Sequence, residues 1–487
     1  MKIYKSLINK WLIVVALLSS AGLASAQEVS IAQRLQEAVQ LYKDNKLGDA
    51  LSKVEALAKE APENADVLQW LGFLYLKSNR PADAIPPLVK AADKMPQNVE
   101  VMNNLGSAYL ATNDLDKALQ SFGKAVEIQP DFFDAWYNIG IIRQQRGELD
   151  KAEEAFQKAS KIRPDDPFTL NNLGAVLTAK GQHDKAADLF IRAAKLRPQR
   201  ATFSMNAGLT LLRLNRVNDA IPYLESAYQL DPDSTETIAG LSQAYLATKQ
   251  SQKALQMLER AVQKKENDAV LWYNLGVVQG KLGRLQEAIQ SYEKALAINS
   301  QDTDALNNLG LAQFHSGRYE DAETTFTKLT GLLPGSLDAK MNLAAAKVKT
   351  GKLDEAVQLY KEIIRSAPSR HDVRLALANA LYRTGDFQGA QYHYRQLLLG
   401  NPKHAEALNG LGLIAYKDGN MREAEKYFRD AIAADSRFAQ AYNNLAVTLE
   451  RLNKKQEAIK MLKRALQIEP DYEEAKKNLE RMERTGT

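Results

Sequence analysis

The sequence predicts an all-α fold, a solenoid of tandem helix-turn-helix repeats. Three observations predict it. The chain repeats with a period of 34 residues, and thirteen repeats run from residue 31 to residue 472 without an insertion or deletion. Glycine or asparagine recurs near the middle of each repeat, and proline recurs near its end. A fixed period of this length is typical of helix pairs that bury their apolar faces only by stacking on one another.

The fifteenth residue of each repeat predicts the turn between its two helices. It is glycine or asparagine in every repeat except the seventh, where it is Lys249. Gly and Asn end a helix readily because they adopt the left-handed conformation at little steric cost. The thirty-second residue is proline in ten repeats. It predicts the end of the second helix, because proline lacks the N–H that an interior helical residue donates.

Two positions are small in every repeat and predict close contact between the helices. The twentieth residue is always alanine, and the eighth is glycine, alanine or serine. We expect these two positions to face each other across the helix pair. Large apolar residues at the seventh and twenty-fourth positions, such as Leu105 and Phe122, are expected to fill the space between the helices.

A family resemblance follows from these positions. The clearest repeat contains Trp136-x-x-Ile139-Gly140, Ala152-x-x-x-Phe156 and Pro164. This spacing resembles the signature of the tetratricopeptide repeat (TPR) family, and the resemblance extends over residues 31–472. It implies a right-handed superhelix in which the first helix of each repeat lines a concave face. Residues 473–487 are expected to form a polar helix that caps the open end of the array.

The first 26 residues match a secretory signal peptide. A head with three lysines precedes the apolar run WLIVVALL, and the small residues ASA precede the expected cleavage after Ala26. A short lead at residues 27–30 would follow, and the mature protein would be periplasmic or secreted, with no transmembrane segment. The alternative is an uncleaved anchor in the inner membrane. The stretch from Trp11 to Ala26 is shorter than the roughly 20 residues of a spanning helix.

The composition excludes several kinds of chemistry. The 487 residues contain no cysteine, which excludes disulfides and cysteine-ligated metals. Without residues 1–26 the chain has 61 basic and 59 acidic residues, so nucleic acid is not an expected partner. The five histidines lack the spacing of metal ligands on one helical face, and no phosphate-binding loop motif occurs. We therefore expect no enzymatic activity, no catalytic residues, no metal and no cofactor.

The candidate site for a protein partner is the groove lined by the first helices. Asparagine recurs at the sixth position, where its amide donates to and accepts from a peptide backbone. The alternative is that these asparagines only join neighbouring repeats. Aromatic residues near Tyr42 suit apolar anchors of a partner. The candidate groove residues are Trp70, Phe73, Asn104, Asn138, Asn172, Asn206, Asn274, Asn308, Asn342 and Asn444.

The thirteenth position forms a second recurring feature, because it is basic in eight repeats. A basic stripe favours acidic partners, although such residues are also common on a solvated face. The basic residues are Lys43, Lys77, Arg213, Lys281, Lys349, Arg383, Lys417 and Arg451.

Together these features predict an exported, non-catalytic scaffold for protein–protein interaction. The expected setting is envelope assembly: pilus, outer-membrane or exopolysaccharide machinery, with association with a membrane complex and self-association as open alternatives. The alternative function is a glycan-handling periplasmic module of a polysaccharide synthesis and export complex. In that case sugars would stack on Trp70, Phe73 or Tyr42.

Overall fold

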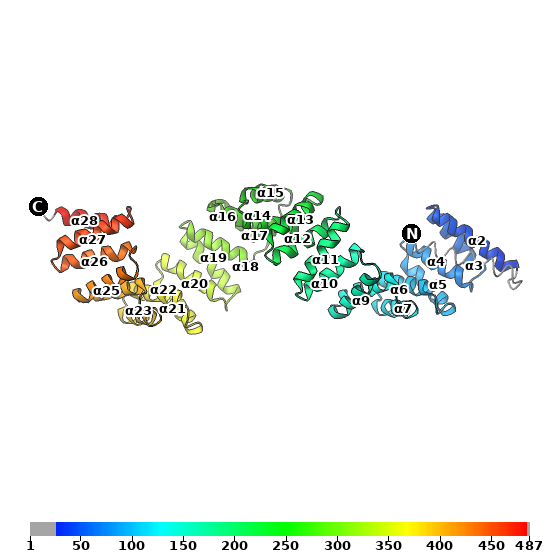
Figure 1. The fold of residues 1–487 in the computed structure, drawn as a ribbon, viewed down its shortest axis with the longest axis horizontal. Helices are drawn as coiled ribbons and strands as arrows, with labels where there is room; N and C mark the ends of the chain where they lie inside the picture. The colour runs from blue at the N-terminus through cyan, green and yellow to red at the C-terminus, as the bar shows by residue number, and fades with distance from the viewer. Residues whose placement is uncertain (1–25, 485–487) are drawn as a thin grey trace. The chain divides into compact units, whose positions relative to one another are not determined.

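The computed structural model describes residues 26–484, and over that range it contains 27 α-helices and no β-strand (Figure 1). Successive helices pack as antiparallel pairs, each pair being one repeat. The predicted all-α array of helix pairs is therefore confirmed. The chain forms two compact bodies, an N-terminal body that ends at Thr248 and a C-terminal body that begins at Lys249.

The helices of the N-terminal body are α2 (Ala26–Lys43), α3 (Leu47–Glu60), α4 (Ala65–Lys77), α5 (Pro81–Lys94), α6 (Val99–Ala111), α7 (Leu115–Ile128), α8 (Phe133–Gln145), α9 (Leu149–Ile162), α10 (Pro167–Ala179), α11 (His183–Leu196), α12 (Ala201–Arg213), α13 (Val217–Leu230) and α14 (Thr235–Ala247). Even-numbered helices are the first helices of the repeats. Residues 27–30, expected as a lead, belong to α2. Apart from Ala26, the predicted signal peptide lies outside the described residues.

The helices of the C-terminal body are α15 (Ser251–Lys264), α16 (Ala269–Lys281), α17 (Leu285–Ile298), α18 (Thr303–His315), α19 (Tyr319–Leu332), α20 (Leu337–Lys349), α21 (Leu353–Ser366), α22 (His371–Thr384), α23 (Phe387–Gly400), α24 (Ala405–Lys417), α25 (Met421–Ala434), α26 (Ala439–Arg451), α27 (Lys455–Ile468) and α28 (Glu473–Arg484). α28 follows the last complete repeat. It packs Ala475 and Met482, both 0% exposed, against the preceding helices.

All thirteen predicted turn residues have a positive φ angle, which confirms the turn in every repeat. The angles lie between +57° at Asn79 and +91° at Gly385. Lys249 adopts the same conformation, with φ +61°, although it has a side chain that disfavours it. The geometry of the repeat therefore requires this conformation whichever residue stands there.

Polar caps start many of the first helices. The side chains of Asn64, Asp166 and Ser336 accept a hydrogen bond from the backbone N–H three residues later. Such a cap satisfies one of the N–H groups that a helix start leaves unpaired. The proline two residues beyond many second helices and the cap before the next first helix together fix the short connection between repeats.

The core of each repeat depends on one close contact between its helices. A β-carbon on Gly140 would lie 2.7 Å from the ring of Phe156. A β-carbon on Gly106 would lie 2.7 Å from the ring of Phe122. The eighth position therefore faces the twenty-fourth. The twentieth residue also lies close to it in the sixth repeat, where a β-carbon on Gly208 would be 3.3 Å from the backbone oxygen of Ala220. The large side chain at the twenty-fourth position needs this space. The alanine at the twentieth position is 0% exposed in all thirteen repeats, as its small size predicts.

One buried charge cluster joins neighbouring repeats in the C-terminal body. Glu323 on α19 accepts hydrogen bonds from Lys347 (3.0 Å), Lys352 (2.7 Å) and Thr350 (2.8 Å). Burial raises the pKa of Glu323, but these three hydrogen bonds outweigh burial and hold the pKa at about 2. With every group paired, the cluster stabilises the stacking of two repeats, and nothing in it is left to act as an acid or base.

The strained turn at Lys249 gives the first prediction. Lys249→Gly removes the steric cost of the left-handed conformation, about 1 kcal/mol, and is expected to raise the midpoint of urea unfolding. The matched control is Gly283→Ala, because Gly283 has φ +75° and a β-carbon there would contact nothing within 4 Å. That substitution adds backbone strain alone and is expected to lower the midpoint. An unchanged or lower midpoint for Lys249→Gly would contradict the argument.

Candidate interaction face

The first helix of each repeat presents one continuous stripe. Its second, sixth, ninth and thirteenth positions are separated by four, three and four residues, so they lie above one another on one side of the helix. We call this surface the first-helix face. The eight candidate asparagines occupy its sixth position, and all eight are half-buried.

These asparagines make a recurring hydrogen bond between repeats. In five of the eight, the side-chain Nδ2 donates to the residue 35 positions earlier, the fifth position of the preceding repeat. The bonds are Asn172 to Tyr137 Oη (3.2 Å), Asn206 to Asn171 Oδ1 (2.8 Å), Asn308 to Tyr273 Oη (3.3 Å), Asn342 to Asn307 Oδ1 (3.2 Å) and Asn444 to Asn409 Oδ1 (2.9 Å). Asn478 on α28 extends the pattern with a bond to Asn443 Oδ1 (2.9 Å).

The other three candidate asparagines differ. Asn274 donates to the Val270 carbonyl of its own helix at 2.8 Å. Asn138 stands 35 residues after Asn103, whose buried Oδ1 has no hydrogen-bond partner among the described residues. The bond pattern supports the alternative that the asparagines join neighbouring repeats. Partner binding through the same side chains, Asn104 included, stays a prediction.

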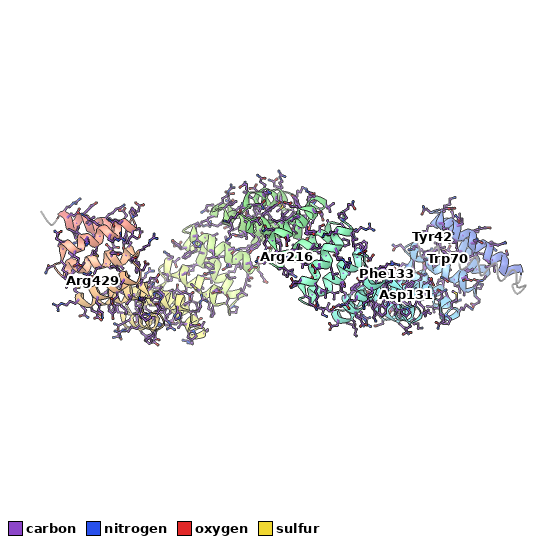
Figure 2. All side chains as sticks on the ribbon, in the orientation of Figure 1. Tyr42, Trp70, Asp131, Phe133, Arg216 and Arg429 are labelled. Atoms are coloured by element: carbon purple, nitrogen blue, oxygen red, sulfur yellow. The ribbon has the colours of Figure 1, made fainter. Side chains whose placement is uncertain are left out.

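The aromatic candidates form a cluster with one another. Tyr42 from α2 lies beside Trp70 from α4 (Figure 2), and both contact Phe73. The ring centroids are 5.3 Å apart for Tyr42 and Phe73 and 5.4 Å apart for Trp70 and Phe73, with the rings meeting edge to face. Phe73 is only 6% exposed, so it belongs to the core of the first repeats. Trp70 and Tyr42 are half-buried and keep part of their surface at the face.

Within residues 26–484 no three His, Asp or Glu side chains gather as a set of metal ligands. None of the described helices has the length and apolar character needed to cross a membrane.

Family models cover most of the repeat array. A model described as "Tetratricopeptide repeat" matches residues 35–99, 172–235, 307–371 and 375–437. Other models with this description match residues 211–275, 131–199, 269–302 and 439–480, and one described as "TPR repeat" matches residues 106–145. No curated protein matches the chain.

The chain is also similar to solved structures. One is described as "Crystal structure of APC/C hetero-tetramer Cut9-Hcn1", with 16% sequence identity over 96% of this chain and 98% of that chain and a TM-score of 0.40. Another is "Crystal structure of MamA", with 26% identity over 34% of this chain and 96% of that chain and a TM-score of 0.32.

The hydrogen bond between Asn444 and Asn409 gives the second prediction. Asn409 is 5% exposed and its side-chain Oδ1 accepts the bond from Asn444. Asn444→Ala therefore leaves the Oδ1 of Asn409 buried without a donor, at a cost of about 1–3 kcal/mol. We expect a clearly lower midpoint of urea unfolding. Asn274→Ala is the control and is expected to have a smaller effect, because Asn274 bonds only within its own helix.

The same pair provides a second check. Adding Asn409→Leu to Asn444→Ala removes the buried Oδ1 that has lost its donor. The double variant is expected to recover part of the lost stability. If Asn444→Ala and Asn274→Ala lowered the midpoint equally, the bond between repeats would not be what the sixth position contributes.

Proposed function

The chain belongs to the tetratricopeptide repeat family, and from this we propose that it is an exported scaffold that holds segments of partner proteins on its first-helix face. Proteins of this family are typically non-catalytic scaffolds for protein–protein interaction. The observation that supports the proposal is the recurring amide bond between first helices. It fixes neighbouring helices side by side. A partner therefore meets a preformed surface, and binding costs the scaffold little conformational entropy.

We propose envelope assembly as the setting, in pilus, outer-membrane or exopolysaccharide machinery. The signal-like residues 1–26 and the absence of cysteine support export to a compartment outside the cytoplasm. The glycan-handling alternative is less well supported. It needs an open ring face for a sugar, whereas Phe73 is 6% exposed and the rings of Tyr42 and Trp70 meet its ring edge to face.

Photo-crosslinking in the source cell tests the scaffold proposal. Asn172 itself is unsuitable for the probe, because its amide bonds to Tyr137. Ala179 lies seven residues further along α10, on the same side of the helix, and is exposed and small. The control probe replaces Asp188, which is exposed on the second helix α11. We expect a discrete protein adduct at Ala179 and none at Asp188. Equal labelling at the two positions would contradict binding on the first-helix face.

Export has its own test. Cell fractionation followed by N-terminal sequencing is expected to find the protein outside the cytoplasm with Gln27 as its first residue. A membrane-bound protein that keeps Met1 would instead support the uncleaved anchor. A cytoplasmic protein would refute export and leave the scaffold proposal to the crosslinking result.

A further inference from the structure

Six consecutive first helices of the C-terminal body end in a basic side chain at the thirteenth position of the repeat. We call these six residues the basic column. Each is exposed, and each stands in the last turn of its helix, on the first-helix face. The residues are Lys281, His315, Lys349, Arg383, Lys417 and Arg451.

The basic column is not neutralised by the protein itself. In the described part of the chain none of its six members forms an ion pair with a carboxylate. Other cations of the same body do: Lys347 pairs with Glu355 at 2.5 Å, and Lys454 pairs with Glu425 at 2.8 Å. The five lysines and arginines of the column are thus left facing solvent without a carboxylate partner among the described residues, together with the exposed His315.

A purely structural role does not account for the run of six. A cation at a helix C-terminus is stabilised by the negative end of the helix dipole. However, four of the seven repeats that begin in the N-terminal body have an uncharged residue at the same position, namely Ala111, Gln145, Ala179 and Ala247, and their first helices form equally well. A first helix of this repeat therefore does not need a basic last residue.

Aromatic rings lie between members of the basic column. Phe314 and Tyr319 contact each other with centroids 5.3 Å apart, and the Lys349 ammonium of the next repeat lies 5.6 Å from the Tyr319 ring. The same arrangement recurs two repeats later, where Tyr382 and Phe387 are 5.4 Å apart and Lys417 lies 4.6 Å from the Phe387 ring. Cation–π contacts of this kind hold these two ammonium groups in place. At Lys349 and Lys417 the column thus places positive charge beside aromatic surface.

We propose that the basic column binds an extended, acidic segment of a protein partner. This inference rests on the proposed scaffold function and adds the chemistry of the partner. The six basic residues stand at the same position of successive repeats, so a ligand that meets all of them must be extended along the array. A polyproline II segment has three residues per turn, so every third side chain points the same way. Acidic residues at every third position would therefore face the basic column together.

The low density of charge along the column favours a polypeptide over a uniform polyanion. The column supplies one basic residue per repeat. At the other end of the first-helix face Asp338 and Asp372 both pair with Arg370, so that end adds no row of free charge. Duplex DNA carries a charge every ~1.7 Å, far denser than one cation per repeat can match. A polypeptide places carboxylates on one side only and presents apolar residues to the rings.

The test measures the affinity of the purified protein for labelled peptides by fluorescence anisotropy. The probe is a proline- and leucine-containing peptide of about 18 residues with glutamate at every third position, long enough to span the column. A peptide of the same composition with its glutamates consecutive is the control ligand. Sodium alginate and a single-stranded oligonucleotide represent anionic glycans and nucleic acids.

Two protein variants with the same change in net charge separate the column from the overall charge. The column variant is Lys349→Glu, Arg383→Glu and Lys417→Glu. The control variant is Lys328→Glu, Lys426→Glu and Lys460→Glu, at exposed positions of the second helices α19, α25 and α27. Circular dichroism establishes that both are folded. We expect the column variant to bind the probe at least about tenfold more weakly than the control variant, because three attractive charge pairs become repulsive.

The outcomes decide the proposal. Equal affinity of both variants, or equal affinity for the two peptides, would overturn it. Tighter binding of alginate or of the oligonucleotide, lost in the column variant, would overturn it in favour of that ligand class. Absence of peptide binding together with a discrete adduct at Ala179 would overturn the basic-column proposal alone, because Ala179 lies in the N-terminal body. Absence of both would overturn the scaffold function as well.

Discussion

The contact between the eighth and twenty-fourth residues of each repeat is the constraint on which the rest of the structure depends. A glycine on the first helix leaves room for a phenylalanine, tyrosine or leucine on the second, and the distances from Gly140 to Phe156 and from Gly310 to Phe326 leave no space for a β-carbon. The large side chain then buries its whole surface, as the 0% exposure of Phe156 shows. Because the two helices approach this closely, the turn between them is short and its fifteenth residue must be left-handed.

Once the helix pair is fixed, stacking follows from contacts between neighbours only, as is typical of repeat proteins. Apolar residues supply most of this contact, and polar bonds fix its register. The amide at the sixth position donates to the residue 35 positions earlier, which is one more than the period. The bond therefore joins the first helices of two neighbouring repeats. In the C-terminal body the Glu323 cluster joins the second helix α19 to the next first helix α20 and the turn after it. Both kinds of bond fix a first helix to the preceding repeat, which is what a preformed binding face requires.

The two bodies share this framework and differ in what they present at the ends of the first helices. The N-terminal body has an aromatic cluster around Trp70 and few cations at the thirteenth position. The C-terminal body has an uninterrupted row of basic residues with aromatic rings between them. Since these side chains contribute little to the helix-pair contact, they vary without disturbing the fold. A scaffold of this design can therefore hold chemically different partner segments on the same backbone.

The sequence by itself determined the period, the helix pairs, the left-handed turn residues and the buried alanines, because each depends on residues within one repeat. Even Lys249 adopts the left-handed conformation that the glycines and asparagines at this position of the other repeats predict. Tertiary structure alone decided that the side chain at the twenty-fourth position packs on the small eighth residue. Sequence spacing does not show how two helices are rotated against each other. Tertiary structure also decided that Phe73 belongs to the core, that the asparagine amides bond to the preceding repeat, and that the basic column has no carboxylate partner among the described residues. These features depend on the rise and rotation between repeats, which bring together side chains that a 34-residue pattern does not relate.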